Sequence, residues 1–347
     1  MRDGERPESP ELSRSYIDVH KGLKGLKMAD YSKAVVKLID LISNILGGFV
    51  SPKTKRLNAE ADADTIRTIS TAIYENPGLP IKYDKDGIVI DATDHNELAA
   101  RTAARVAIQE LKKQQNIESV VGKTAVLLEG EEAVSETPVD KDWAFRFFDS
   151  VANISSEEMQ TLWAKLLAGE VKQPGSFSFR AMETLRNMTS GEAQLFQRVA
   201  TYVVDVGDGY LLLSDKSYLS SVGIELLDIL RLSESGLINT SSVGYKFSPA
   251  IEERTFLKNK KEIIRFRRTV EKKVEFQVGV YLLTGVGKEL LQIVDIPEDQ
   301  VGLLRILWHL KKQQLSGFEM TLHDIVDDSN EADIKLSKAK AIFKTDK

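Results

Sequence analysis

The sequence predicts a mixed α+β fold that is mostly helical with a minor β component. Apolar residues recur at helical spacing through much of the first two hundred residues. After residue 206, short strand-like runs alternate with helical segments. The composition, 42% hydrophobic and 29% charged, is that of a globular protein, and 347 residues are enough for two or three cores. We therefore expect N-terminal helices, a central helical module and a winged-helix-like C-terminal part.

The N-terminal part should begin with a mobile tail at 1–28, because this stretch lacks periodic apolar residues. A helical region should follow at 29–128, with helices near 56–74 and 95–118. Within it, an Asp-Gly pair between two strand-like runs predicts a small hairpin at 80–91.

The first helix of this region has a broad apolar face flanked by lysines. Core packing is the commoner use of such a face, but a protein partner or peripheral membrane contact is the alternative. The residues that would form such a partner or membrane helix are Val35, Leu38, Ile42, Ile45, Leu46 and Phe49.

Residues 129–141 are acidic, contain a proline and lack periodicity, so we expect a linker between domains there. A compact helical module should occupy 142–205. Two Ser/Thr-x-x-Glu spacings, Ser155 to Glu158 and Thr189 to Glu192, are typical of helix starts.

A winged-helix-like α+β module is expected at 206–300, followed by a C-terminal helix and a frayed tail at 301–347. The helix in the recognition position, about 222–235, is apolar and has three acidic residues against one arginine. Such a helix is unsuited to the major groove of DNA. A winged helix used for packing, or one that dimerises, is the better interpretation.

No catalytic, cofactor or metal site is recognisable in the sequence. The fragments ending in Gly122-Lys123-Thr124 and Gly285-Val-Gly-Lys288 lack the first glycine of a phosphate loop and are better read as a turn and a helix start. The four histidines have no paired ligand spacing, and there is no cysteine. An enzyme whose site is assembled from distant residues stays open, although the sequence favours a non-enzymatic protein.

A basic segment at 254–273 has nine Lys or Arg residues against two glutamates. It could contact nucleic-acid phosphates, or it could be a solvated amphipathic helix or a subunit contact. The candidate nucleic-acid contacts are Lys258, Lys260, Lys261, Arg265, Arg267 and Arg268.

The segment ISSEEMQTLWAKLLAGE at 154–170, continued by PGSFSFRAMETLRNMTSGEAQLF, resembles a family of uncharacterised bacterial proteins classed as a domain of unknown function. It is also distantly similar to the abortive-infection alpha-type proteins. The resemblance implies a bacterial cytoplasmic protein with a role in phage defence, and it brings no catalytic residues.

The residues of this family block have a physical interpretation of their own. Trp163, Leu166 and Leu167 should lie in the core, because they form one apolar helical stripe. Glu170, Arg180 and Arg186 could form a structural ion-pair network or, alternatively, a ligand clamp.

The function expected from the sequence is that of a cytoplasmic interaction or scaffold protein, acting as a homo-oligomer or through a protein partner. Nucleic-acid binding through 254–273 is the alternative. The N-terminus has no apolar signal segment, and no apolar run reaches membrane-spanning length.

Overall fold

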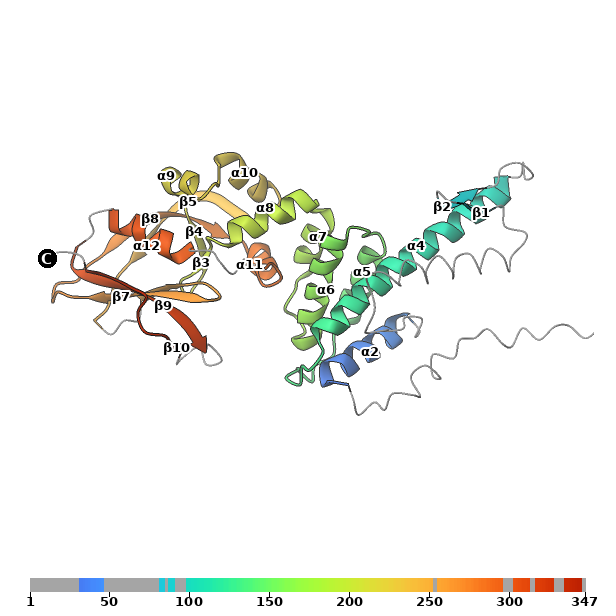
Figure 1. Cartoon of the computed structure of the whole chain (residues 1–347), viewed down its shortest axis with the longest axis horizontal. Coiled ribbons are helices and arrows are strands. Elements are labelled where there is room, and N and C mark those ends of the chain that lie inside the picture. Colours follow the sequence, from blue (N-terminus) through green and yellow to red (C-terminus); the bar gives the residue numbers. More distant parts are fainter. Residues whose placement is uncertain are drawn as a thin grey trace, which may run out of the picture. The chain divides into compact units, whose positions relative to one another are not determined.

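The computed structural model describes residues 31–46, 81–84, 87–90, 98–251, 255–295, 302–312, 316–327 and 334–344 (Figure 1). Both helices and antiparallel strands are present, so the fold is mixed α+β. The chain divides into two compact units, Met1–Ser176 and Phe177–Lys347. The tail at 1–28 and the helix expected near 56–74 fall outside the described residues.

The first unit is mainly helical. Its strands β1 and β2 pair antiparallel, with Ile81 opposite Ile90 and Asp84 opposite Gly87, where the sequence predicts a hairpin. Its long helix extends further than the periodicity indicates, ending at Leu127. The elements are α2 (Lys33–Leu46), β1 (Ile81–Asp84), β2 (Gly87–Ile90), α4 (Leu98–Leu127), α5 (Lys141–Val151) and α6 (Glu157–Lys172).

The core of the first unit is built around Trp163 on α6, whose side chain is fully buried. Its ring meets the edge of Phe147 on α5 at a centroid distance of 5.5 Å, and Phe147 stacks on Trp143 at 5.3 Å. Leu166 and Leu167 are also fully buried. Trp163 therefore contributes to packing and does not line an open cleft.

The apolar face of α2 is directed into the same unit. Val35, Leu38 and Ile42 are buried, and α2 packs against α5 and α6. Ile45 and Leu46 are half-buried, and Phe49 lies outside the described residues. This corrects the hypothesis of a partner or membrane helix, because the side chains that would make the contact already pack within the unit.

The sequence predicts a linker between domains at 129–141. In the structure, residues 129–140 instead pack within the first unit. Ser135 donates its backbone N–H to Lys172 O at 2.9 Å, and Ala34 N–H donates to Glu131 O at 3.2 Å. Lys37 Nζ donates to Ser135 O at 2.8 Å. These bonds tie the segment to α2 and α6, so proline and acidic residues here mark a packed loop.

The second unit begins with α7 and α8, so the unit boundary falls inside the stretch expected to form one helical module at 142–205. The physical reason is the packing: α6 lies on α4 in the first unit, whereas α7 packs on α11 and α8 on α10 in the second. The helices of the second unit are α7 (Phe179–Asn187), α8 (Ser190–Ala200), α9 (Lys216–Ser221), α10 (Leu226–Glu234), α11 (Gly285–Leu291) and α12 (Gly302–Lys312).

Local capping explains where two of these helices start. Thr189 and Glu192 form the reciprocal capping box that their spacing predicts, at the start of α8. The start of α6 differs by one residue, because Ser156 and not Ser155 accepts the N–H of Met159. Ser155 and Glu158 therefore do not form the predicted box.

The described residues of the second unit also hold a nine-stranded antiparallel sheet. The strand order is β10-β9-β7-β6-β3-β4-β8-β5, and β11 pairs with β9. The strands are β3 (Val204–Asp205), β4 (Tyr210–Leu213), β5 (Ile238–Phe247), β6 (Thr255–Lys258), β7 (Glu262–Arg268), β8 (Phe276–Leu283), β9 (Phe318–Asp327), β10 (Lys335–Leu336) and β11 (Ala341–Lys344).

This sheet curls, so that strands distant in the strand order share one core. Phe276 on β8 stacks on Phe318 of β9 at 5.0 Å, and Phe247 on β5 stacks on Phe266 of β7 at 5.8 Å. The N–H of Arg268 at the end of β7 also donates to Ala250 O, just beyond β5, at 3.0 Å. Four strands separate the members of each pair in the sheet order, so only a strongly curved sheet can bring them together.

The C-terminal part corrects the expectation for 301–347. A helix is present, α12, but residues 318–327 do not fray. They form β9, which pairs with β7 over seven residues and with β10 and β11 on its other side. Alternating apolar residues such as Phe318, Met320 and Leu322, all buried, are the pattern that indicates this strand.

Gly287, near the start of α11, allows that helix to approach the chain between α10 and β5. A Cβ atom at Gly287 would lie 2.1 Å from the carbonyl oxygen of Leu237. That oxygen also accepts the N–H of Thr284, which caps α11. The fragment Gly285-Val-Gly-Lys288 is thus a helix start, as the sequence predicts, and it is capped at a close backbone contact.

We predict that Gly287→Ala lowers the free energy of unfolding by about 1–3 kcal/mol, because the backbone of α11 or of Leu237 must shift. Gly285→Ala is the matched control, since a Cβ there meets nothing within 4 Å. Urea denaturation of both variants checks the prediction. Equal midpoints for the two variants would contradict it.

Candidate functional site

The most exposed apolar cluster on a described helix lies on α10, where Leu226, Leu227 and Leu230 are 62%, 66% and 41% exposed. We call these three residues the leucine face. The opposite side of the helix carries Ile229 and Leu232, both fully buried. A helix that exposes three leucines beside a normally packed inner side is typical of a contact surface.

The charges around the leucine face are arranged with opposite signs at its two ends. Exposed Glu225 precedes the helix, and its backbone N–H donates to Asp228 Oδ2 at 3.2 Å. Exposed Arg231 lies one turn further on. Asp228 is held by Arg198 of α8 at 3.1 Å. With Glu234 at its end, α10 carries a net negative charge, as the sequence indicates.

A second candidate is a cavity of about 170 Å³ between β3, β4, the β6–β7 turn and α11. We call it the lysine pocket, because Lys258, Lys260 and Lys288 line it together with Asp205 and Tyr210. Ala200, Val203 and Leu291 contribute apolar wall. Three ammonium groups against one carboxylate make the lining positive overall.

The lysines of the pocket are held by specific contacts. Lys258 Nζ lies 3.5 Å from Asp205 Oδ2, and both side chains are less than one fifth exposed. Lys260 Nζ donates to the carbonyl oxygen of Val294 at 3.1 Å. Lys288 Nζ lies over the ring of Tyr210, 5.5 Å from its centroid.

The predicted nucleic-acid contacts are divided among several surfaces. The basic segment forms the β6–β7 hairpin and not an amphipathic helix, so alternate residues point to opposite faces. Arg265 and Arg267 share one face of β7, and Arg267 pairs there with Glu319 at 2.9 Å. Arg268 points to the other face, where its buried Nε has no partner among the described residues. Only Lys258 and Lys260 of the six line the pocket.

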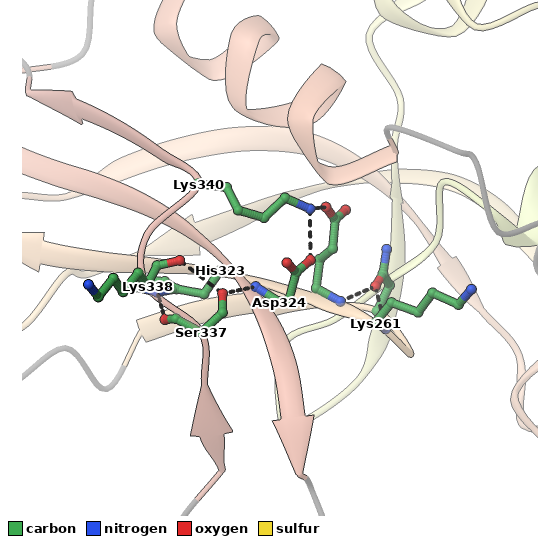
Figure 2. A network of polar contacts seen from close by, with 8 residues as sticks. Lys261, His323, Asp324, Ser337, Lys338 and Lys340 are labelled. Atoms are coloured by element: carbon green, nitrogen blue, oxygen red, sulfur yellow. Dashed lines mark hydrogen bonds and ion pairs between the residues drawn. The ribbon is translucent and has the colours of Figure 1, made fainter.

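A polar network fixes the C-terminal strands to this hairpin (Figure 2). Lys340 Nζ donates to Glu262 Oε1 and to Asp324 Oδ1, both at 2.7 Å. Asn259 Oδ1 accepts the N–H groups of Lys261 and Glu262 in the turn. In Figure 2 the side chains of Lys261 and Lys338 extend away from the network.

His323 belongs to the same network and has a structural role. Its ring nitrogens lie 3.0 Å from Ser337 O and 2.9 Å from Thr321 Oγ1. The Ser337 hydroxyl in turn accepts the N–H of Asp324 at 2.9 Å. Within the described ranges no group of three His, Asp or Glu side chains is placed to hold a metal ion.

Other sequence candidates have structural roles. Thr124 of the Gly-Lys-Thr fragment is buried inside α4, and its hydroxyl donates to Val120 O at 2.8 Å. Glu170 is buried at the end of α6 and accepts the N–H of Gly175 at 2.6 Å. Arg180 is exposed, and Arg186 pairs with Glu183 on its own helix at 3.3 Å. These contacts do not assemble a ligand clamp.

The sequence predicts the leucine face and the lysine pocket only in part. The apolar, acidic character of the recognition-position helix is a sequence signal for the leucine face. Lys288, Tyr210 and Asp205 are far apart in the chain, and no sequence signal joins them to Lys258 and Lys260.

Comparison with known protein families gives one match to this chain. A family model described as "Protein of unknown function (DUF2806)" matches residues 100–302, more than half of the chain. A search of curated proteins and a search of solved structures gave no match. Among the described helices, none is long and apolar enough to cross a membrane.

The Lys340 network supplies a prediction about stability and pH. The hydrogen bonds to Asp324 and then to Glu262 raise the pKa of Lys340 above 10.5. We expect Lys340→Met to lower the free energy of unfolding by about 1 kcal/mol, because Lys340 is 43% exposed and solvent screens both pairs. A group with a raised folded pKa stabilises fully below its unfolded pKa. The difference from the wild type should therefore persist at neutral pH and shrink above pH 10.5.

The matched control is Lys338→Met, since that side chain points away from the network. It should change stability by less than about 0.5 kcal/mol. Urea denaturation at several pH values measures both variants. Equal stability of the two variants at pH 7 would show that the network contributes nothing.

Proposed function

Since the chain belongs to the family described as protein of unknown function (DUF2806), we propose its role from its own surface: it is a non-enzymatic interaction protein that self-associates through α10. The observation that carries the proposal is the leucine face, with three leucines exposed on one side of a helix that is otherwise packed. The occupant we assign is a second copy of the chain.

The charge pattern of α10 favours a second copy, because the helix is complementary to itself when antiparallel. If Leu227 of one copy lies beside Leu230 of the other, Leu226 lies beside Arg231. Glu225 is then one residue from that position, so Arg231 of each copy lies near Glu225 of the other. A two-fold axis forms each of these contacts twice.

The leucine face is small, so the association should be weak and depend on concentration. A fully buried leucine contributes about 1.5–3 kcal/mol, and these leucines are already partly buried. The two copies together bury six leucines. Their contribution offsets the cost of association, about 4–15 kcal/mol, only if that cost lies near the lower end of this range. The charge pairs and the surrounding surface must supply the remainder.

The topology around α10 supports its use as a contact helix. We interpret the elements α8, β4, α9, α10, β5 and β8 as a winged-helix-like arrangement with the β6–β7 hairpin inserted in its wing; the neighbouring strands β4-β8-β5 support this interpretation. In that arrangement α10 takes the recognition position. Its leucines and net negative charge suit a protein partner better than the phosphates of DNA.

Sedimentation velocity over a concentration series tests the proposal. The wild type should shift from monomer to dimer as concentration rises. The double variant Leu227→Glu, Leu230→Glu should weaken the dimer at least about tenfold, which corresponds to 1.4 kcal/mol. Val326→Glu is the matched control, since Val326 is 68% exposed on β9 and should leave the dimer intact.

A charge exchange tests the antiparallel register. Glu225→Arg and Arg231→Glu should each weaken the dimer, because each creates two like-charge contacts. The combined variant should restore it. A wild type that stays monomeric throughout, or a dimer indifferent to the Leu227 and Leu230 substitutions, would overturn the proposal.

The likeness of residues 154–170 to abortive-infection alpha-type proteins leads us to place this association in phage defence. Cells that carry the wild-type chain should then survive phage challenge better than cells carrying the Leu227→Glu, Leu230→Glu variant at equal protein level. Counting survivors after infection measures this. Equal survival would remove the defence role without bearing on the dimer itself.

A further inference from the structure

We propose that the lysine pocket binds the phosphate group of a small phosphorylated ligand. This inference is independent of self-association, because the pocket and the leucine face share no residue. Three observations carry it: the charge of the lining, the rigidity of the elements that hold the lysines, and the size of the cavity.

The charge of the lining favours an anion. Asp205 neutralises one ammonium, that of Lys258, across 3.5 Å. Lys288 faces the Tyr210 ring and has no carboxylate partner among the described residues. Lys260 Nζ donates to the carbonyl oxygen of Val294, so its ammonium group is held at the wall of the pocket. A phosphate entering between these groups would gain charge-assisted hydrogen bonds.

The lysines are held on elements that cannot move freely, so little ordering is needed on binding. Lys258 ends β6, in register with Asp205 of β3 and Ile263 of β7. Asn259 fixes the turn that carries Lys260, since it accepts two backbone N–H groups at 2.8 and 2.7 Å. The close contact at Gly287 fixes α11 one residue before Lys288.

The cavity size limits the ligand. A volume of about 170 Å³ is below the range of about 300–1,000 Å³ that holds drug-sized molecules. It accommodates a phosphate group with a small attached moiety. Tyr210 and Leu291 give that moiety an aromatic and an apolar wall.

A polynucleotide backbone offers the same phosphate chemistry, but the surrounding surface favours a small ligand. Arg267 is paired with Glu319, and Arg268 points to the opposite face of β7. The cations of the hairpin therefore do not continue the pocket as a stripe, which a strand of nucleic acid would need.

Calorimetric titration of the full chain with inorganic phosphate tests the pocket, with chloride at equal ionic strength as reference. We expect saturable binding to the wild type, and at least tenfold weaker binding to Lys288→Met. Asp205→Asn should bind more tightly, because it removes the one carboxylate among the described residues of the lining. Lys261→Met is the matched control and should bind like the wild type, since Lys261 is not one of the residues that line the pocket.

Titrations with glycerol 3-phosphate and with a single-stranded oligonucleotide distinguish the sources of the phosphate. Glycerol 3-phosphate should bind at least as tightly as inorganic phosphate, and the oligonucleotide should not bind more tightly at 150 mM salt. Absence of saturable phosphate binding, or equal affinity of wild type and Lys288→Met, would overturn the proposal. Preferential oligonucleotide binding with a steep salt dependence would overturn it in favour of a nucleic-acid surface.

Discussion

Stacking of four phenylalanines is the interaction on which the second unit depends. Phe247, Phe266, Phe276 and Phe318 come from four strands. Phe247 and Phe276 stack across the neighbouring strands β5 and β8, whereas the stacked pairs Phe247–Phe266 and Phe276–Phe318 join strands that are not neighbours in the sheet. Offset aromatic pairs contribute about 0.5–1.5 kcal/mol beyond their buried area. Because the rings hold the sheet in its curved form, they also place the β6–β7 turn against β3 and α11, where the lysine pocket lies.

The two candidate surfaces are mechanically connected although they share no residue. The chain leaving α10 passes Leu237, whose carbonyl oxygen accepts the N–H of Thr284 at the start of α11. The Thr284 hydroxyl also donates to Gly236 O at 2.6 Å. The absence of a side chain at Gly287 makes this approach possible. A ligand at Lys288 and a partner on the leucine face, as proposed, would therefore act on helices that share one junction.

Local sequence signals were reliable where a single element satisfies its own requirements. The capping box at Thr189 and the buried stripe of Trp163, Leu166 and Leu167 follow from residues within one or two turns. Sequence patterns did not predict the structure reliably where it depends on a packing or pairing partner that is distant in the sequence. The apolar face of α2 favours core packing but leaves a partner or membrane contact open, and its burial depends on its packing against α5 and α6. Residues 318–327 needed β7 as a neighbour to become a strand.

Composition and short-range periodicity alone predict the mixed α+β class, and they show the apolar, net acidic character of the α10 segment. The placement of the cations of 254–273 depends instead on the tertiary structure: Lys258 and Lys260 line a pocket, whereas Arg265, Arg267 and Arg268 are divided between two faces of β7. Strand pairing sends neighbouring side chains to opposite faces. It also brings Asp205, Tyr210 and Lys288 beside Lys258 from up to about fifty residues away, a proximity that no linear spacing encodes.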